Sequence, residues 1–186
     1  LRMANLRLKP KKCHMFQSST LYLGFLVTGD GVSADPRKVE AVRTWTVPHN
    51  LTRLRQFLGL CNYHRKFIPE YATVAGPLYE LARKGVSWHW DPEQDRAFNR
   101  LKELLTQAPC LSHPRPEGKF LLDTDASLSG IGGALYQEQD GDERLIAYFS
   151  KTLSDTQRNY CTTKRELLAV VRSMEWFRPY LWGRPF

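Results

Sequence analysis

The chain has 186 residues, of which 42% are hydrophobic and 12% aromatic, and this composition favours a folded protein over a disordered one. It contains no run of eighteen apolar residues and no charged-then-apolar leader, so we expect neither a membrane partner nor a secretory signal. The first residue is Leu1, which suggests a segment taken from a longer protein.

The net charge of +8 is confined to the first half of the chain. Residues 1–90 carry 14 basic and 5 acidic side chains, whereas residues 91–186 carry 13 and 14. A basic half beside a near-neutral half with clustered acids is typical of a nucleic-acid-binding surface joined to a metal site. Basic charge alone would be equally consistent with a solvated surface.

The four cysteines lie too far apart to provide the paired ligands of a zinc ribbon or knuckle. They are Cys13, Cys61, Cys110 and Cys161. We therefore expect free thiols in a reducing, intracellular compartment.

Residues 1–109 are expected to be mainly helical. An apolar run at 21–27 predicts one short strand, which ends at the glycine-containing turn signal 28–31. Asp35-Pro36, Asn50 and Asp91-Pro92 are helix-start signals, because Asp and Asn cap a first turn and Pro fits into it. With proline as the stop signal, we expect helices from Pro36 towards Pro48, from Leu51 towards Pro69, from Tyr71 to Leu81, and from Pro92 towards Pro109.

The hydrophobic period changes after a Pro- and Gly-containing segment at 110–118, which we interpret as a linker. Three strands are expected at 119–125, 132–137 and 144–150, and Asp140-Gly141-Asp142 predicts a hairpin between the last two. A helix should follow from Thr162 or Thr163 to about Trp176. The predicted fold class is α+β, with one domain at 1–109 and a second at 119–186.

Two acidic residues carry the chemistry that the sequence suggests. Asp125 lies in a predicted strand, and Glu166 precedes the apolar stretch of the last helix. Acids on a strand and on the following helix can converge on one divalent metal, since magnesium takes a few carboxylate oxygens together with substrate phosphate. Two carboxylates make only half of a two-metal site, which needs further acidic ligands.

Many ordered motifs then resemble one family over nearly the whole chain. The first half contributes Lys12-Cys13-His14-Met15-Phe16, Tyr22-Leu23-Gly24-Phe25, Asp35-Pro36-Arg37-Lys38, Leu54-Arg55-Gln56-Phe57-Leu58-Gly59-Leu60 and Tyr63-His64-Arg65-Lys66-Phe67-Ile68. The second half contributes Asp123-Thr124-Asp125-Ala126-Ser127, Gly130-Ile131-Gly132-Gly133-Ala134-Leu135, Tyr148-Phe149-Ser150-Lys151-Thr152-Leu153 and Arg165-Glu166-Leu167-Leu168-Ala169. Together they resemble the pol polyprotein of gypsy-class long-terminal-repeat retrotransposons. The chain departs from that pattern at His64, where a tyrosine is usual, and at Gly133, where an alanine is usual.

The resemblance implies the end of the reverse transcriptase palm and a helical, thumb-like or connection segment at 1–109. An incomplete ribonuclease H-like domain would follow at 119–186, as a three-stranded antiparallel meander plus a helix. Asp125 and Glu166 would be catalytic residues and ligands of magnesium, with manganese as an alternative ion. A third acid is expected in a T-D-H motif beyond Phe186, and the paired polymerase aspartates before Leu1. The parent protein would extend DNA on a template and hydrolyse the RNA strand of RNA–DNA hybrids.

The expected partners are an RNA–DNA hybrid, a primer–template duplex and the remainder of the polyprotein. Arg53, Arg55, Arg65 and Lys66 would contact backbone phosphates, and Ser127 would lie in a turn near the substrate. The expected location is cytoplasmic, in the retroelement particle, with the nucleus as a second location. Two alternatives stay open: a non-catalytic nucleic-acid-binding or structural remnant, and a module recruited by the host for protein contacts.

Overall fold

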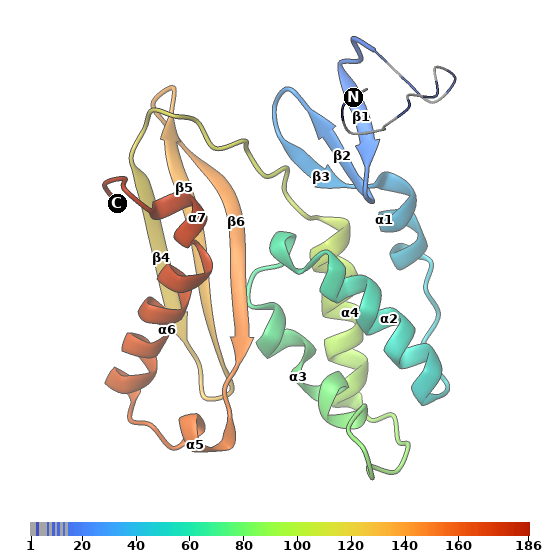
Figure 1. Ribbon diagram of the computed structural model, residues 1–186. Coiled ribbons are helices and arrows are strands. Elements are labelled where there is room, and N and C mark those ends of the chain that lie inside the picture. Colours follow the sequence, from blue (N-terminus) through green and yellow to red (C-terminus); the bar gives the residue numbers. More distant parts are fainter. Residues whose placement is uncertain (1–2, 4–6, 8, 10, 12, 14) are drawn as a thin grey trace.

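The computed structural model describes residues 3, 7, 9, 11, 13 and 15–186, so Lys12 and His14 of the first motif lie outside the described residues. The described chain forms a helical half and a sheet half, which lie side by side (Figure 1). None of its helices is long and apolar enough to cross a membrane.

A small antiparallel sheet comes first, with the strand order β1 (Ser19–Tyr22), β2 (Phe25–Thr28) and β3 (Val32–Ala34). The prediction of a single strand at 21–27 is therefore wrong. The chain reverses at Leu23 and Gly24, whose φ angles of 47° and 75° are those of a two-residue hairpin turn. Leucine rarely adopts a positive φ, so Gly24 was the one residue of this turn from which the sequence could have predicted it.

Four α-helices and a short 3₁₀ helix build the helical half, and the predicted helix starts are confirmed. The elements are α1 (Pro36–Arg43), α2 (Leu51–Tyr63), the 3₁₀ helix η3 (Arg65–Phe67), α3 (Tyr71–Leu81) and α4 (Pro92–Thr106). The Asp35 carboxylate accepts a hydrogen bond from the Arg37 N–H, and the Asn50 side chain accepts one from the Arg53 N–H. These caps satisfy amides that have no partner within the helix.

One hydrophobic core holds this half together. Fully buried Phe57 of α2 and Phe98 of α4 lie with their ring centroids 4.6 Å apart, in one buried cluster with Leu78 of α3 and Leu101 of α4. The apolar stripes expected from the sequence thus meet in a single cluster. The basic residues of α2, Arg53 and Arg55, therefore face the solvent.

The second half is a three-stranded antiparallel meander, as predicted. Its strands are β4 (Phe120–Ala126), β5 (Gly130–Gln139) and β6 (Asp142–Thr152), in that spatial order. Asp140 and Gly141, with φ of 57° and 88°, form the predicted hairpin turn between β5 and β6. Three helices follow: α5 (Asp155–Arg158), α6 (Thr162–Trp176) and α7 (Arg178–Leu181).

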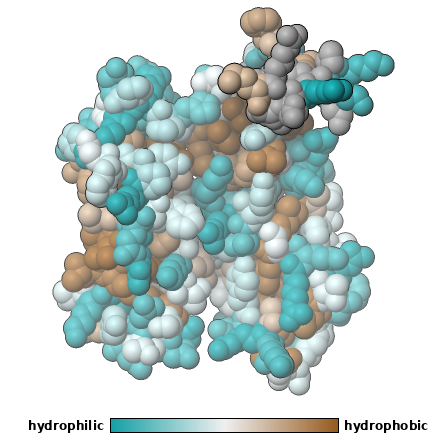
Figure 2. Space-filling view, in the orientation of Figure 1, coloured by the Kyte–Doolittle hydropathy of each residue, from teal (hydrophilic) through white to brown (hydrophobic). Residues whose placement is uncertain are grey.

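Helix α6 covers one face of this sheet, where Phe120, Ile131, Leu135, Phe149 and Ala169 are buried together. The outer side of α6 stays apolar and exposed at Leu167, Val171 and Met174, and Figure 2 shows hydrophobic surface over this region at the lower left.

The helical half packs beside β6, on the sheet side that α6 leaves open. The Ala72 N–H at the start of α3 donates to Ser150 Oγ at 2.8 Å. The Thr73 and Ser127 hydroxyls lie 3.4 Å apart. Ser127 and Ser150 thus connect the sheet directly to α3.

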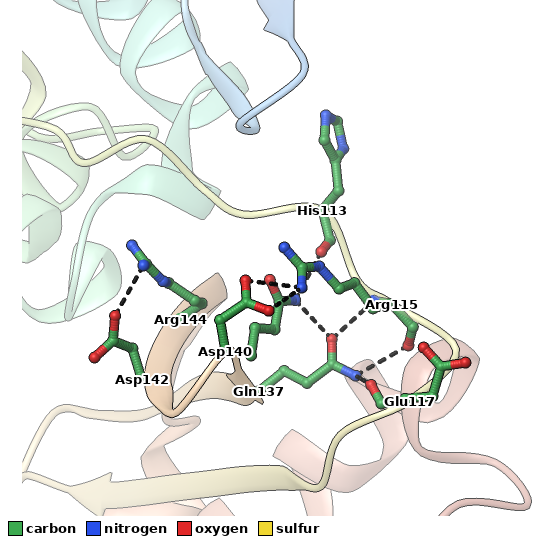
Figure 3. Close-up of polar contacts among 8 residues, drawn as sticks. His113, Arg115, Glu117, Gln137, Asp140, Asp142 and Arg144 are labelled. Atoms are coloured by element: carbon green, nitrogen blue, oxygen red, sulfur yellow. Dashed lines mark hydrogen bonds and ion pairs between the residues drawn. The ribbon is translucent and has the colours of Figure 1, made fainter.

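The segment 110–118 runs from α4 to β4 in an extended form and is tied down along its length. Leu111 forms a β-bridge with Val32, and the His113 ring lies 2.8 Å from the Thr28 carbonyl oxygen. Gln137 of β5 is fully buried, and its side-chain amide bonds to the backbone of Arg115 and Glu117 (Figure 3). The segment is therefore part of the packed structure as well as a connection.

Candidate functional site

Asp125 lies near the end of β4, on the sheet face opposite α6. Alternate residues of a strand point to opposite faces, and Leu122 and Ala126 of β4 pack into the core under α6. Asp123 and Asp125 therefore share the other face. Asp125 pairs with Gly132 of β5, which places no side chain beside the carboxylate.

A hollow of about 170 Å³ lies on this face. Asp123, Asp125 and Tyr148 of the sheet line it, together with Pro69 and Glu70 just before α3. Both aspartates are exposed. The hollow is thus acidic and open to solvent.

Glu166 lies on the exposed flank of α6. The preceding Arg165 is buried, along with Ala169 and Ser173 one and two turns later, so these residues form the face of α6 that meets the sheet. Arg165 Nη1 donates to the Ser127 carbonyl oxygen at 3.4 Å. This contact places the start of α6 beside the turn that follows Asp125.

The two predicted metal ligands are therefore near the same end of β4 but not in contact. In the part of the chain that the structure describes, no hydrogen bond or ion pair joins Asp125 to Glu166, and no three His, Cys, Asp or Glu side chains cluster closely enough for a metal ion. Both carboxylates are exposed, and no ion pair among the described residues occupies their oxygens. They fit oxygen ligands of magnesium, which would need further ligands from water, substrate or other carboxylates.

Ser127 is used within the turn between β4 and β5. Its Oγ accepts hydrogen bonds from the N–H groups of Gly130 at 2.9 Å and Ser129 at 3.2 Å. The hydroxyl thereby shapes the turn, and its neighbour Thr73 links that turn to α3.

The predicted phosphate-binding residues fall into two pairs. Arg53 and Arg55 lie in the first turns of α2 and are exposed, and Arg55 Nη2 donates to the Ala82 carbonyl oxygen at 3.3 Å. Arg65 and Lys66 lie on η3, beyond the other end of α2. The two pairs therefore flank most of the length of α2.

The η3 pair is held by aromatic rings. The Arg65 guanidinium lies 5.0 Å from the Trp176 ring centroid, and Lys66 Nζ lies 4.1 Å from that of Phe25. Burial lowers the pKa of Lys66 from its usual value. Lys151 and Arg172, to which the sequence analysis gave no binding role, lie near Arg65. Lys151 stands in one of the family motifs, but its proximity to Arg65 depends on the packing of the two halves.

Residues 90–186 match the family described as "RNase H-like domain found in reverse transcriptase". Over 97% of its length, the chain is 38% identical to the Retrovirus-related Pol polyprotein from transposon opus of Drosophila melanogaster. It is 37% identical, over 97% of its length, to the Transposon Tf2-3 polyprotein of Schizosaccharomyces pombe. The chain spans only 19% and 14% of these two relatives.

Two solved structures of the foamy viral protease-reverse transcriptase share the fold. The complex with an RNA/DNA hybrid has a TM-score of 0.78 and 24% identity, covering 94% of this chain and 24% of that one. The complex with double-stranded DNA has a TM-score of 0.77 and 24% identity, covering 94% of this chain and 37% of that one. The fold and the match over residues 90–186 agree, and the chain belongs to the family of ribonuclease H-like domains found in reverse transcriptase, with Pol polyproteins of transposons as its relatives.

Proposed function

We propose that this chain is part of a gypsy-class reverse transcriptase and ribonuclease H, and that it binds RNA–DNA hybrid and primer–template duplex. The observation that carries the proposal is the combination of basic residues on the helical half with the exposed carboxylates of Asp125 and Glu166 in a ribonuclease H-like domain. Two foamy viral relatives in fold were solved with such nucleic acids. The proposed partners also include the rest of the polyprotein.

The helical half supplies the binding surface in this proposal. Arg53 and Arg55 at one end of α2, and Arg65 and Lys66 beyond its other end, present positive charge on the solvent side of a rigid core. Phosphate contacts of this kind bind without reading sequence.

Asp125 and Glu166 are the proposed catalytic residues and the proposed ligands of magnesium or manganese. Bound magnesium would activate water and stabilise the leaving oxygen in phosphodiester hydrolysis. Asp125 is suited to a ligand role because its carboxylate is exposed beside Gly132, which leaves space for a ligand. Arg165 orients the start of α6, and with it Glu166, by its contact to the Ser127 carbonyl. The proposed location is the cytoplasm, within a retroelement particle, or the nucleus.

A second candidate is a nucleic-acid-binding segment without catalysis of its own. It is favoured by the absence, among the described residues, of three His, Cys, Asp or Glu side chains that are grouped closely enough to hold a metal ion. A labelled RNA–DNA hybrid with magnesium or manganese separates the two candidates. We expect binding with very weak or no cleavage by this chain alone. Robust cleavage that Asp125→Asn abolishes, and that the exposed control Asp142→Asn does not, would contradict this expectation and assign catalysis to the chain itself.

A further inference from the structure

A groove of about 400 Å³ lies where the helical half meets the sheet half. We call it the junction groove. It is lined by Arg65 of η3, Ser150 and Lys151 of β6, and Arg172, Glu175 and Trp176 of α6. Side chains from three elements that are distant in the sequence thus form one surface.

The junction groove is positively charged. It has three cationic side chains and one carboxylate, and that carboxylate is taken up by Arg172, whose Nη1 lies 2.6 Å from Glu175 Oε2. The ion pairs found within residues 15–186 involve neither Arg65 nor Lys151. Two cations, one from each half, are therefore available to an anionic ligand.

Arg65 is held in place before any ligand arrives. Its guanidinium lies over the Trp176 ring, and that ring packs against Phe149 with centroids 5.5 Å apart. A side chain that is already ordered loses less conformational entropy on binding than a free one. Trp176 is thus a positioning residue for Arg65.

We propose that the junction groove binds the phosphodiester backbone of a nucleic-acid strand through Arg65 and Lys151. This inference rests on the proposed duplex binding and locates part of its path. Arg65 is adjacent to Lys66 on η3, so the groove joins the basic residues of η3 to the sheet. A ligand with repeated negative charges fits two separated, unpaired cations better than a single small anion does. Ser150 is engaged by α3, so the groove spans the contact between the two halves.

The test measures binding of the full chain to a fluorescently labelled RNA–DNA hybrid by fluorescence anisotropy, over a range of salt concentrations. Arg65→Gln and Lys151→Gln each remove one charge, and Arg96→Gln, on exposed α4 surface outside the groove, is the charge-matched control. Each contact to one phosphate contributes about 0.9 to the slope of log affinity against log salt concentration. Relative to about 1 M salt, this contribution is worth about eightfold in affinity at about 0.1 M salt. We expect each groove variant to bind about eightfold more weakly at about 0.1 M salt and to show a slope smaller by about 0.9, whereas the control should keep the affinity and slope of the unaltered chain.

The role of Trp176 is tested in the same assay. Trp176→Leu should weaken binding less than Arg65→Gln does, and the double variant should bind no more weakly than Arg65→Gln alone, because both changes act through one guanidinium. Thermal unfolding of each variant verifies that the fold is retained.

Three outcomes would overturn the inference in distinguishable ways. If the unaltered chain binds the hybrid and both groove variants bind equally well, the groove is not on the nucleic-acid path. If the groove variants lose affinity only for an acidic peptide, the groove takes a protein partner. If the unaltered chain binds no hybrid at all, the proposed function fails and the inference fails with it.

Discussion

The hydrogen bonds of the buried Gln137 side chain should hold the segment 110–118 against the sheet. The variant Gln137→Leu should therefore lower the free energy of unfolding. The amide nitrogen donates to the carbonyl oxygens of Arg115 at 3.0 Å and Glu117 at 2.7 Å, and the amide oxygen accepts from the Arg115 N–H and from Gln139 Nε2, both at 2.8 Å. Figure 3 shows these contacts converging on the one side chain. Leucine has a similar size but makes none of them.

The expected destabilisation follows from these four hydrogen bonds. At about 0.5–1.5 kcal/mol net for each, their loss amounts to about 2–6 kcal/mol. Residues 115–118 are exposed, so water can satisfy part of the freed backbone, and Arg184 still donates to the carbonyl oxygens of Arg115 and Gly118. We therefore expect the lower part of that range, about 2–4 kcal/mol, in the free energy of unfolding.

Urea unfolding, followed by circular dichroism, measures this loss. Gln107→Leu, at the exposed end of α4, is the matched control and should change the free energy of unfolding by no more than about 0.5 kcal/mol. A Gln137→Leu variant as stable as this control would show that the glutamine contacts do not hold the segment.

Three further predictions concern His64, Gly133 and the relative stability of the halves. His64 is buried among Phe25, Tyr63 and Phe67 without a hydrogen-bond partner in the described structure, and burial lowers its pKa. The unfolded chain therefore binds the proton more readily, so the free energy of unfolding should fall as the pH drops below about 6.5, and His64→Phe should remove this dependence; equal pH profiles of the two proteins would contradict it. A Cβ on Gly133 would lie 2.5 Å from Ser173 Oγ, whereas one on Gly132 would meet only the Phe149 carbonyl oxygen at 3.6 Å. In urea unfolding, Gly133→Ala should therefore lower the free energy of unfolding by about 1–3 kcal/mol, and Gly132→Ala should change it little. Amides of residues 120–150 should exchange faster than those of 51–67 in a monomeric sample, because α6 covers only one sheet face and β4 is an edge strand; stronger protection in the strands would show that the sheet is self-sufficient.

Local signals made most of the fold predictable. Asp35-Pro36, Asn50 and Asp91-Pro92 start helices, and Asp140-Gly141 turns a hairpin, because each effect is decided within a few residues. The β1–β2 turn was missed because Leu23 adopts a left-handed conformation that its own side chain does not favour. The surroundings of that turn, and not its sequence, decide the conformation.

Long-range packing accounts for the rest. Gly133, where the resembled family usually has alanine, is explained by Ser173, which lies forty residues later and occupies the space that a Cβ would need. Arg65 meets Trp176, and Gln137 meets the segment before β4, only once the two halves are packed. The resemblance supplied Asp125 and Glu166, but their placement near the same end of β4 depends on the buried Arg165 contact.

Salt-dependent binding of the full chain to a short RNA–DNA hybrid tests the central claim most directly. The account predicts that the logarithm of affinity falls linearly with the logarithm of salt concentration between about 50 and about 200 mM, with a slope of about −0.9 for each phosphate contacted. The paired change Arg53→Gln and Arg55→Gln should reduce both affinity and slope, whereas Arg96→Gln should not. Absence of binding would contradict the assignment of this chain to a nucleic-acid-binding role, and binding whose affinity does not change with salt would contradict the proposed phosphate contacts.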